Sequence, residues 1–169
     1  MTTPQENPTE HTRDQKIQRA LLRAYVNKNY DKYQSMWDMA ETRSSKQTWN
    51  WAAFVFSLGW LAYRKMYLLS AIWIALILLE VVASMVVGYA ERYSNIFTMA
   101  LAVDTGQVGN ALYALHANKQ VDQVKAALPS SHWVSTLRVK GGVNWWAGIG
   151  AFVICILLLF FVALVAGTV

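Results

Sequence analysis

Hydrophobic residues are concentrated after residue 48, where they form two long stretches. Residues 66–88 carry one formal charge, Glu80, and residues 145–169 carry none. A helix needs about 20 predominantly apolar residues to cross the hydrocarbon layer of a bilayer. We therefore predict membrane-spanning helices at 66–90 and 145–169.

A third stretch, 94–117, is long enough to span but is interrupted by Asn95, Asp104, Gln107 and Asn110. Asp104 alone costs about 3 kcal/mol at the middle of a membrane helix, and the strongly apolar residues of the stretch return roughly 2 to 4 kcal/mol. Hydrophobicity alone therefore does not predict that this stretch inserts.

The distribution of Lys and Arg favours a third span. If 94–117 crosses the membrane, 14 Lys and Arg residues lie on the cytoplasmic side and only Arg92 lies outside; otherwise the division is ten against five. Membrane proteins keep Lys and Arg in their cytoplasmic loops. We expect three transmembrane helices, with a cytoplasmic amino end and a periplasmic or extracellular carboxyl end.

The segment 48–65 is rich in aromatic residues and ends in Arg64 and Lys65. Its apolar part is only about 15 residues long, which is too short to cross hydrocarbon as a helix. A crossing would also put both basic residues on the outer face. Because Trp and Tyr collect at headgroup level, we expect an interfacial or re-entrant helix at the cytoplasmic face.

The remaining segments are polar. Residues 1–12 have the composition of a disordered tail. Residues 13–47 show two amphipathic patterns separated by Asn27-Lys28-Asn29, which predict short cytoplasmic helices. Residues 118–144 predict a basic cytoplasmic helix, stopped by Pro129, and a linker at Gly141-Gly142. The predicted fold class is an all-α integral membrane protein.

Composition agrees with this fold class. The 169-residue chain is 55% hydrophobic and 15% charged, unlike an average soluble domain. The first 48 residues lack the pattern of a signal peptide, so we expect a mature, cytoplasmic amino end. The net charge of +5 follows from basic residues beside membrane segments, so we expect no nucleic-acid partner.

No motif of a soluble-type enzyme is present in the sequence. The three His residues lack ligand-like spacing, and neither a nucleophile elbow nor a phosphate loop occurs. Cys155 is the single cysteine and lies deep in the last hydrophobic stretch. We expect no catalytic residues, no cofactor and no metal site.

Glu80 and Asp104 are the candidate intramembrane polar site, because carboxyl groups are costly inside a bilayer and often functional. They fall at similar predicted depths and could share a proton or bind a cation. The alternative is that each only packs and hydrogen-bonds. Asp104 lies about 200° around its helix from a stripe of small residues that includes Asn110, which favours separate neighbours. Asn110 and Tyr113 complete the candidate set.

Aromatic and basic residues supply a candidate surface for lipid or protein. Arg64 and Lys65 could bind a lipid phosphate or an acidic partner, or they could simply end the interfacial helix. The candidate contact residues are Trp37, Trp49, Trp51, Trp60, Tyr63, Arg64 and Lys65.

Several sequence blocks resemble a widespread family of small bacterial inner-membrane proteins of unknown function. Where members often continue Gly-Gly-Thr-Ser, this chain has Gly141-Gly142-Val143-Asn144. The resemblance implies architecture and location and supplies no reaction. The blocks are Asn29-Tyr30-Asp31-Lys32-Tyr33, Thr48-Trp49-Asn50-Trp51-Ala52-Ala53-Phe54, Trp60 with Tyr63-Arg64-Lys65-Met66-Tyr67, and Gly109-Asn110-x-x-Tyr113.

Three function classes remain open from the sequence. The first is a non-enzymatic interaction or regulatory subunit that binds membrane lipid, a membrane or cytoplasmic protein, or a second copy of itself at the cytoplasmic face. The second is an ion- or proton-linked transport subunit built around Glu80 and Asp104. The third, membrane immunity against a pore-forming toxin, has no residue in its favour.

Overall fold

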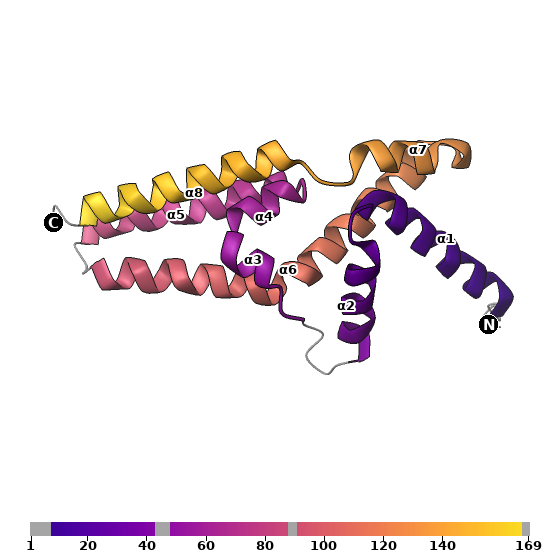
Figure 1. Ribbon diagram of the computed structural model, residues 1–169, viewed down its shortest axis with the longest axis horizontal. Helices are drawn as coiled ribbons and strands as arrows, with labels where there is room; N and C mark the ends of the chain where they lie inside the picture. Colours follow the sequence, from indigo (N-terminus) through magenta and orange to yellow (C-terminus); the bar gives the residue numbers. More distant parts are fainter. Residues whose placement is uncertain (1–7, 43–47, 88–90, 167–169) are drawn as a thin grey trace, which may run out of the picture. The chain divides into compact units, whose positions relative to one another are not determined.

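The computed structural model describes residues 8–42, 48–87 and 91–166, and this part of the chain is helical with no strand (Figure 1). In chain order its elements are α1 (Pro8–Val26), α2 (Tyr30–Thr42), α3 (Trp51–Phe56), α4 (Leu58–Tyr63), α5 (Tyr67–Val87), α6 (Glu91–Ala127), α7 (Ser130–Lys140) and α8 (Trp145–Ala166). The all-helical prediction is confirmed.

Several sequence-based boundaries differ from these elements. Residues 8–12 of the expected tail belong to α1, and 1–7 lie outside the described residues, as do 43–47, 88–90 and 167–169 at the ends of other predicted segments. The expected break after residue 117 is absent, since α6 continues to Ala127. The segment 117–127 contains neither Gly nor Pro, so nothing in it stops a helix before Pro129.

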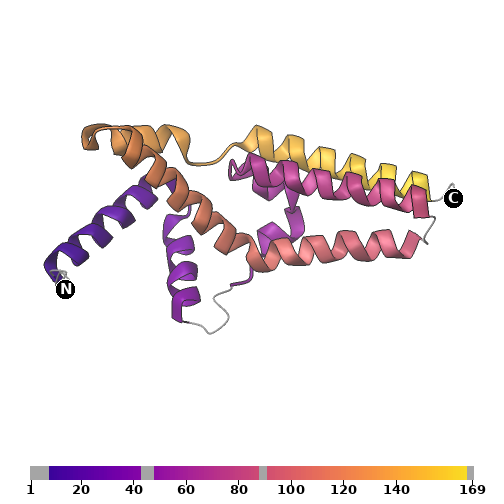
Figure 2. The ribbon, with the colours of Figure 1, turned by 180° about the vertical axis from the view of Figure 1, so that it is seen from behind.

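The chain divides into two compact units. The first, here the α1–α7 unit, comprises residues 1–34 and 115–142. In it α1 packs against α7, and the backbone N–H of Gly142 donates to the carbonyl of Tyr25 at 2.7 Å (Figure 2). A Cβ at Gly141 would lie 1.9 Å from that carbonyl oxygen, so only glycine fits this approach.

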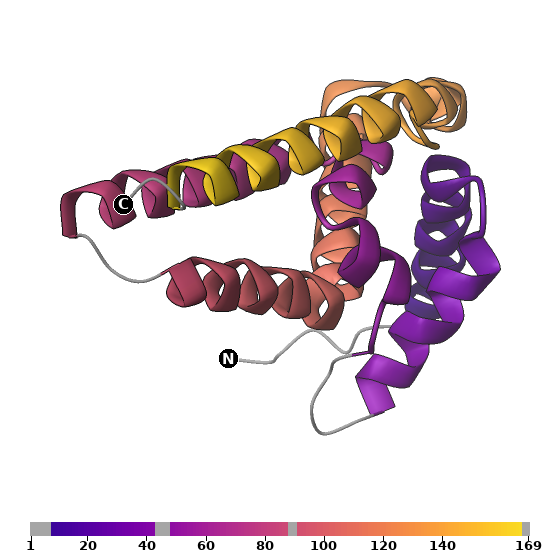
Figure 3. The same ribbon diagram turned by 60° about the vertical axis from the view of Figure 1, so that its left-hand side comes forward.

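The second, here the hairpin unit, comprises residues 35–114 and 143–169. The short helices α3 and α4 follow one another at an angle, and α4 packs against both α5 and α8 (Figure 3). Its long helices carry exposed apolar side chains, such as Leu79 on α5 at 66% exposure and Phe160 on α8 at 69%.

Local sequence explains the hairpin of α3 and α4. The Asn50 side chain accepts a hydrogen bond from the N–H of Ala53 at 3.0 Å and so caps α3. Ser57 then adopts φ 36°, which is uncommon for a non-glycine residue and interrupts the helical path. Lys65, the second residue after α4, adopts φ 60°. The chain therefore turns before α5 begins.

Candidate functional site

Buried polar contacts join the start of the hairpin to α6. The side chain of Asn50 donates from Nδ2 to Oδ1 of Asn110 at 2.8 Å, and its backbone N–H donates to the carbonyl of Gly106 at 2.8 Å. Nδ2 of Asn110 donates to Oγ1 of Thr48 at 2.9 Å. The carbonyl of Asn110 accepts from the Trp37 indole at 3.1 Å. One residue on α6 thus holds segments from two other parts of the unit.

Glycines let the hairpin approach α6 closely. A Cβ at Gly106 would lie 2.8 Å from Cβ of Phe54, and a Cβ at Gly109 would lie 3.0 Å from Cβ of Ala53. Real Cβ atoms do not approach other carbons at the first of these distances. Gly106 and Gly109 of α6 therefore leave the space in which α3 packs.

Arg64 lies inside the unit, at 2% exposure, although it was expected as a candidate lipid or partner contact. Its Cζ is 5.1 Å from the ring centroid of Tyr113 and 5.5 Å from that of Tyr63. Nη1 donates to the Tyr113 hydroxyl at 3.5 Å. Cation–π contacts of this kind are attractive, and more so where water is excluded. Arg64 is thus placed to hold α4 against α6.

The other candidate contact residues divide into inner and outer groups. Trp60 is buried, and its ring lies 6.1 Å from that of Tyr113, as does the half-buried ring of Trp37. Lys65 is half-buried. Trp49 and Trp51 face outward at 37% and 70% exposure, with their rings 5.5 Å apart. The outward tryptophans remain available to a bilayer or a partner.

The structure does not bring the two carboxyl residues into one site. Glu80 is buried, and its Oε1 accepts from the Ser94 hydroxyl at 2.6 Å. Asp104 is exposed and borders a hollow on the surface of α6 that does not include Glu80. The separation of Asp104 from the stripe that holds Asn110 agrees with its position about 200° around an ideal helix.

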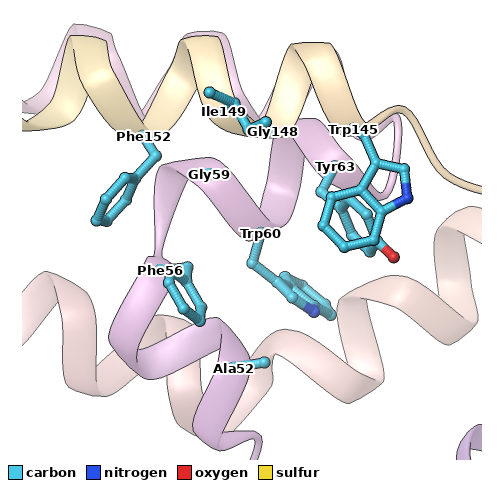
Figure 4. Close-up of a pocket in the computed structure, with 9 residues that line it drawn as sticks. All are labelled: Ala52, Phe56, Gly59, Trp60, Tyr63, Trp145, Gly148, Ile149 and Phe152. Carbon is cyan, nitrogen blue, oxygen red and sulfur yellow. The ribbon is translucent and has the colours of Figure 1, made fainter.

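An apolar groove, here the hairpin groove, runs between α3–α4 and α8 and has a volume of about 330 Å³. Two aromatic pairs border it: Phe56 with Phe152 at 5.6 Å, and Tyr63 with Trp145 at 5.0 Å (Figure 4). The phenol oxygen of Tyr63 and the indole nitrogen of Trp145 lie toward the same end in Figure 4. Its residues are Ala52, Phe56, Gly59, Trp60, Tyr63, Trp145, Gly148, Ile149 and Phe152.

Close helix packing forms the floor of this groove. A Cβ at Gly59 would lie 3.2 Å from the carbonyl oxygen of Gly148, and a Cβ at Gly148 would lie 2.9 Å from Cβ of Tyr63. Small residues permit this kind of approach between helices in membranes. Gly59, Gly148 and Phe152 were not among the residues expected from sequence. Glycines within apolar segments were the available clue, but the sequence does not show which helix packs against them.

The family comparison bears on these residues directly. The profile of a protein family of unknown function, DUF2628, matches residues 18–119. The chain belongs to the DUF2628 family. The match includes α3, α4 and the Asn110 contacts but not α8, which supplies one wall of the hairpin groove. No curated protein and no solved structure matches the chain.

Membership in DUF2628 supplies no chemistry, and the structure offers no metal cluster within its described part. No three His, Cys, Asp or Glu residues of the described ranges lie close enough together to hold a metal ion. One described helix of this DUF2628 chain, Tyr67–Val87, is long and apolar enough to cross a membrane. Residues Trp145–Leu158 of α8 pass that test only together with α7, as a bent pair.

Proposed function

We propose that this DUF2628 protein is a non-enzymatic inner-membrane subunit that binds the acyl chain of an anionic phospholipid in the hairpin groove. The observation that carries the proposal is the groove itself. It is of ligand-pocket size, about 330 Å³, and its lining is dominated by aromatic and small residues. It also borders α8, whose sequence from Trp145 to Ala166 contains no charged residue and so suits hydrocarbon.

Membrane insertion is the first part of the proposal. Only 28% of the most apolar window of α5 is buried, whereas the core helix of a soluble protein would be mostly buried. Exposed apolar side chains all along such a helix suit hydrocarbon. The proposed spans are α5, residues 94–117 of α6, and α8. In this arrangement α3 and α4 enter from the cytoplasmic face and return to it.

The position of aromatic and basic residues supports an anionic lipid. Tyr63 and Trp145 lie at one end of the groove, and Trp146 beside them is 84% exposed. Such rings collect at headgroup level, so this end of the groove would lie at the membrane surface. Lys65 lies two residues after Tyr63 in the sequence, and the proposed topology places further Lys and Arg residues on the same side of the membrane. Basic residues at a membrane surface attract anionic headgroups.

Native mass spectrometry of the purified protein with phosphatidylglycerol or phosphatidylcholine tests lipid binding. Ile149→Trp places a larger ring in the groove, while Ile156→Trp makes the same change at an equally exposed α8 position outside it (52% and 50% exposed). We expect wild type and Ile156→Trp to retain phosphatidylglycerol preferentially. Ile149→Trp should retain roughly tenfold less, the equivalent of about 1.4 kcal/mol. Equal retention by all three proteins would contradict the proposal.

Ion- or proton-linked transport is a second candidate, supported by the burial of Glu80. Its carboxyl group already holds the Ser94 hydroxyl, which also suits a packing role. Glu80→Gln preserves an acceptor for that hydroxyl and removes the carboxyl group. If the protein transports an ion, wild type should give an ion-linked signal in proteoliposomes, and Glu80→Gln should lose that signal at normal abundance. If Glu80 only packs, both proteins should be normally abundant and neither should give the signal.

A further inference from the structure

One face of α6 carries polar side chains in a setting that is otherwise apolar. Asp104 and Gln107 are exposed on this face, beside Ile96 at 62% and Met99 at 60% exposure. An open hollow of about 560 Å³ lies along it, from Asn95 at one end to Asp104 at the other. We name this surface the α6 polar face; it is formed by Ile96, Met99, Ala100, Val103, Asp104 and Gln107.

The exposure of this face conflicts with lipid contact if residues 94–117 span the membrane, as in the proposed topology. Asp104 lies 10 residues after Ser94 and 13 before Ala117, so it falls near the middle of that segment. Among the described residues, Asp104 has no ion pair or hydrogen bond within the chain. A carboxyl group at such a depth faces a protein interior or a partner, because hydrocarbon offers it no hydrogen bond.

The α6 polar face complements itself. Asp104 supplies acceptor oxygens, and the carboxamide of Gln107 supplies N–H donors. A two-fold axis along the membrane normal would pair two α6 helices in parallel, with identical surfaces in contact. Gln107 lies only three residues, about 4.5 Å along the axis, from Asp104. Each Gln107 carboxamide could then donate to Asp104 of the other copy.

Ala100 and the hollow make room for this contact. Small residues allow transmembrane helices to approach closely, and polar side chains then hydrogen-bond between them. The chain has no Lys or Arg between Arg92 and Lys119, so self-pairing would rely on carboxamide donors or a shared proton. We propose that the α6 polar face is the interface of a homodimer, an inference that rests on the proposed three-span topology.

Disulfide crosslinking in native membranes tests the interface. In a Cys155→Ser background, Met99→Cys puts one thiol on the α6 polar face, and Leu79→Cys puts one on α5, where the native side chain is similarly exposed at 66%. We expect oxidation to link Met99→Cys copies into a dimer of twice the chain mass and to leave Leu79→Cys monomeric. An excess of cysteine-free chain should reduce the dimer.

Two further variants separate the hydrogen bonds from general packing. Asp104→Leu, added to Met99→Cys, should lower the dimer yield roughly fivefold or more, since an interhelical polar contact contributes on this scale. Asp104→Asn keeps an acceptor oxygen for the Gln107 carboxamide and should stay within about twofold of the parent. Normal membrane abundance of each variant is the required control.

Three outcomes would overturn the homodimer. They are the absence of a dimer, a dimer yield insensitive to Asp104→Leu, and a crosslink only to a protein of another mass. Failure of the topology itself is distinguishable, because a thiol at residue 93 would then label from the wrong side of the membrane.

Discussion

Asn50 donates a hydrogen bond from its side chain to that of Asn110 across 60 residues of sequence, at 2.8 Å and out of contact with solvent. The same Asn50 caps α3 with its Oδ1. This pair therefore links the local start of the hairpin to its long-range attachment on α6. A buried amide that loses its partner costs more than the net value of the hydrogen bond.

Asn110→Ala should destabilise the hairpin unit by about 1 to 3 kcal/mol, because Asn50 Nδ2 and the Thr48 hydroxyl would lose their buried partner. Asn95→Ala makes the same change on an exposed turn of α6 and should have a smaller effect on unfolding. Thermal unfolding in detergent, followed by circular dichroism, compares the two variants. Equal midpoints for both would show that the Asn110 contacts contribute little.

Gly148→Ala and Gly150→Ala should act in opposite directions. A Cβ at Gly148 would meet Cβ of Tyr63 at 2.9 Å, so overpacking should cost about 1 to 3 kcal/mol. At Gly150 a Cβ would have nothing within 4 Å, and alanine should stabilise the helix by up to about 1 kcal/mol. Both values come from unfolding midpoints in the same detergent. A harmless Gly148→Ala would contradict the close packing of α4 on α8.

Tyr113→Phe should be milder than Tyr113→Leu. The hydroxyl of Tyr113 accepts from Arg64 at a long 3.5 Å, whereas the ring lies 5.1 Å from Arg64 Cζ. Phenylalanine keeps the aromatic face, so its cost should stay below about 1 kcal/mol, and leucine should lose a further 1 kcal/mol or so. If the two variants unfolded alike, the hydrogen bond rather than the ring would hold Arg64.

Local sequence properties predicted much of this structure. Hydropathy identified the stretches that became α5 and α8, and the Asn-rich break after Val26 matches the end of α1, because Asn27 and Asn29 adopt positive φ without great strain. The expectation of an uncharacterised family is confirmed by the DUF2628 match over residues 18–119. The three-span topology and the inner-membrane location stay predictions.

Long-range contacts were not predictable from one sequence. Arg64 follows an aromatic run beside a membrane segment, where basic residues usually reach the surface, and only the fold shows that Tyr113 receives it inside. The hairpin groove likewise needs α8, which lies more than 80 residues after α4 in the sequence. Chain periodicity indicates which face of a helix is small, not which helix will occupy it.

Membrane topology underlies the lipid groove and the homodimer alike, and thiol labelling measures it most directly. Single cysteines at Tyr93 and Gln123, in the Cys155→Ser background, are treated with a membrane-impermeant maleimide in intact spheroplasts and again after lysis. The three-span arrangement predicts that Tyr93→Cys labels in intact spheroplasts and Gln123→Cys only after lysis. Labelling of both positions from the same side would contradict it.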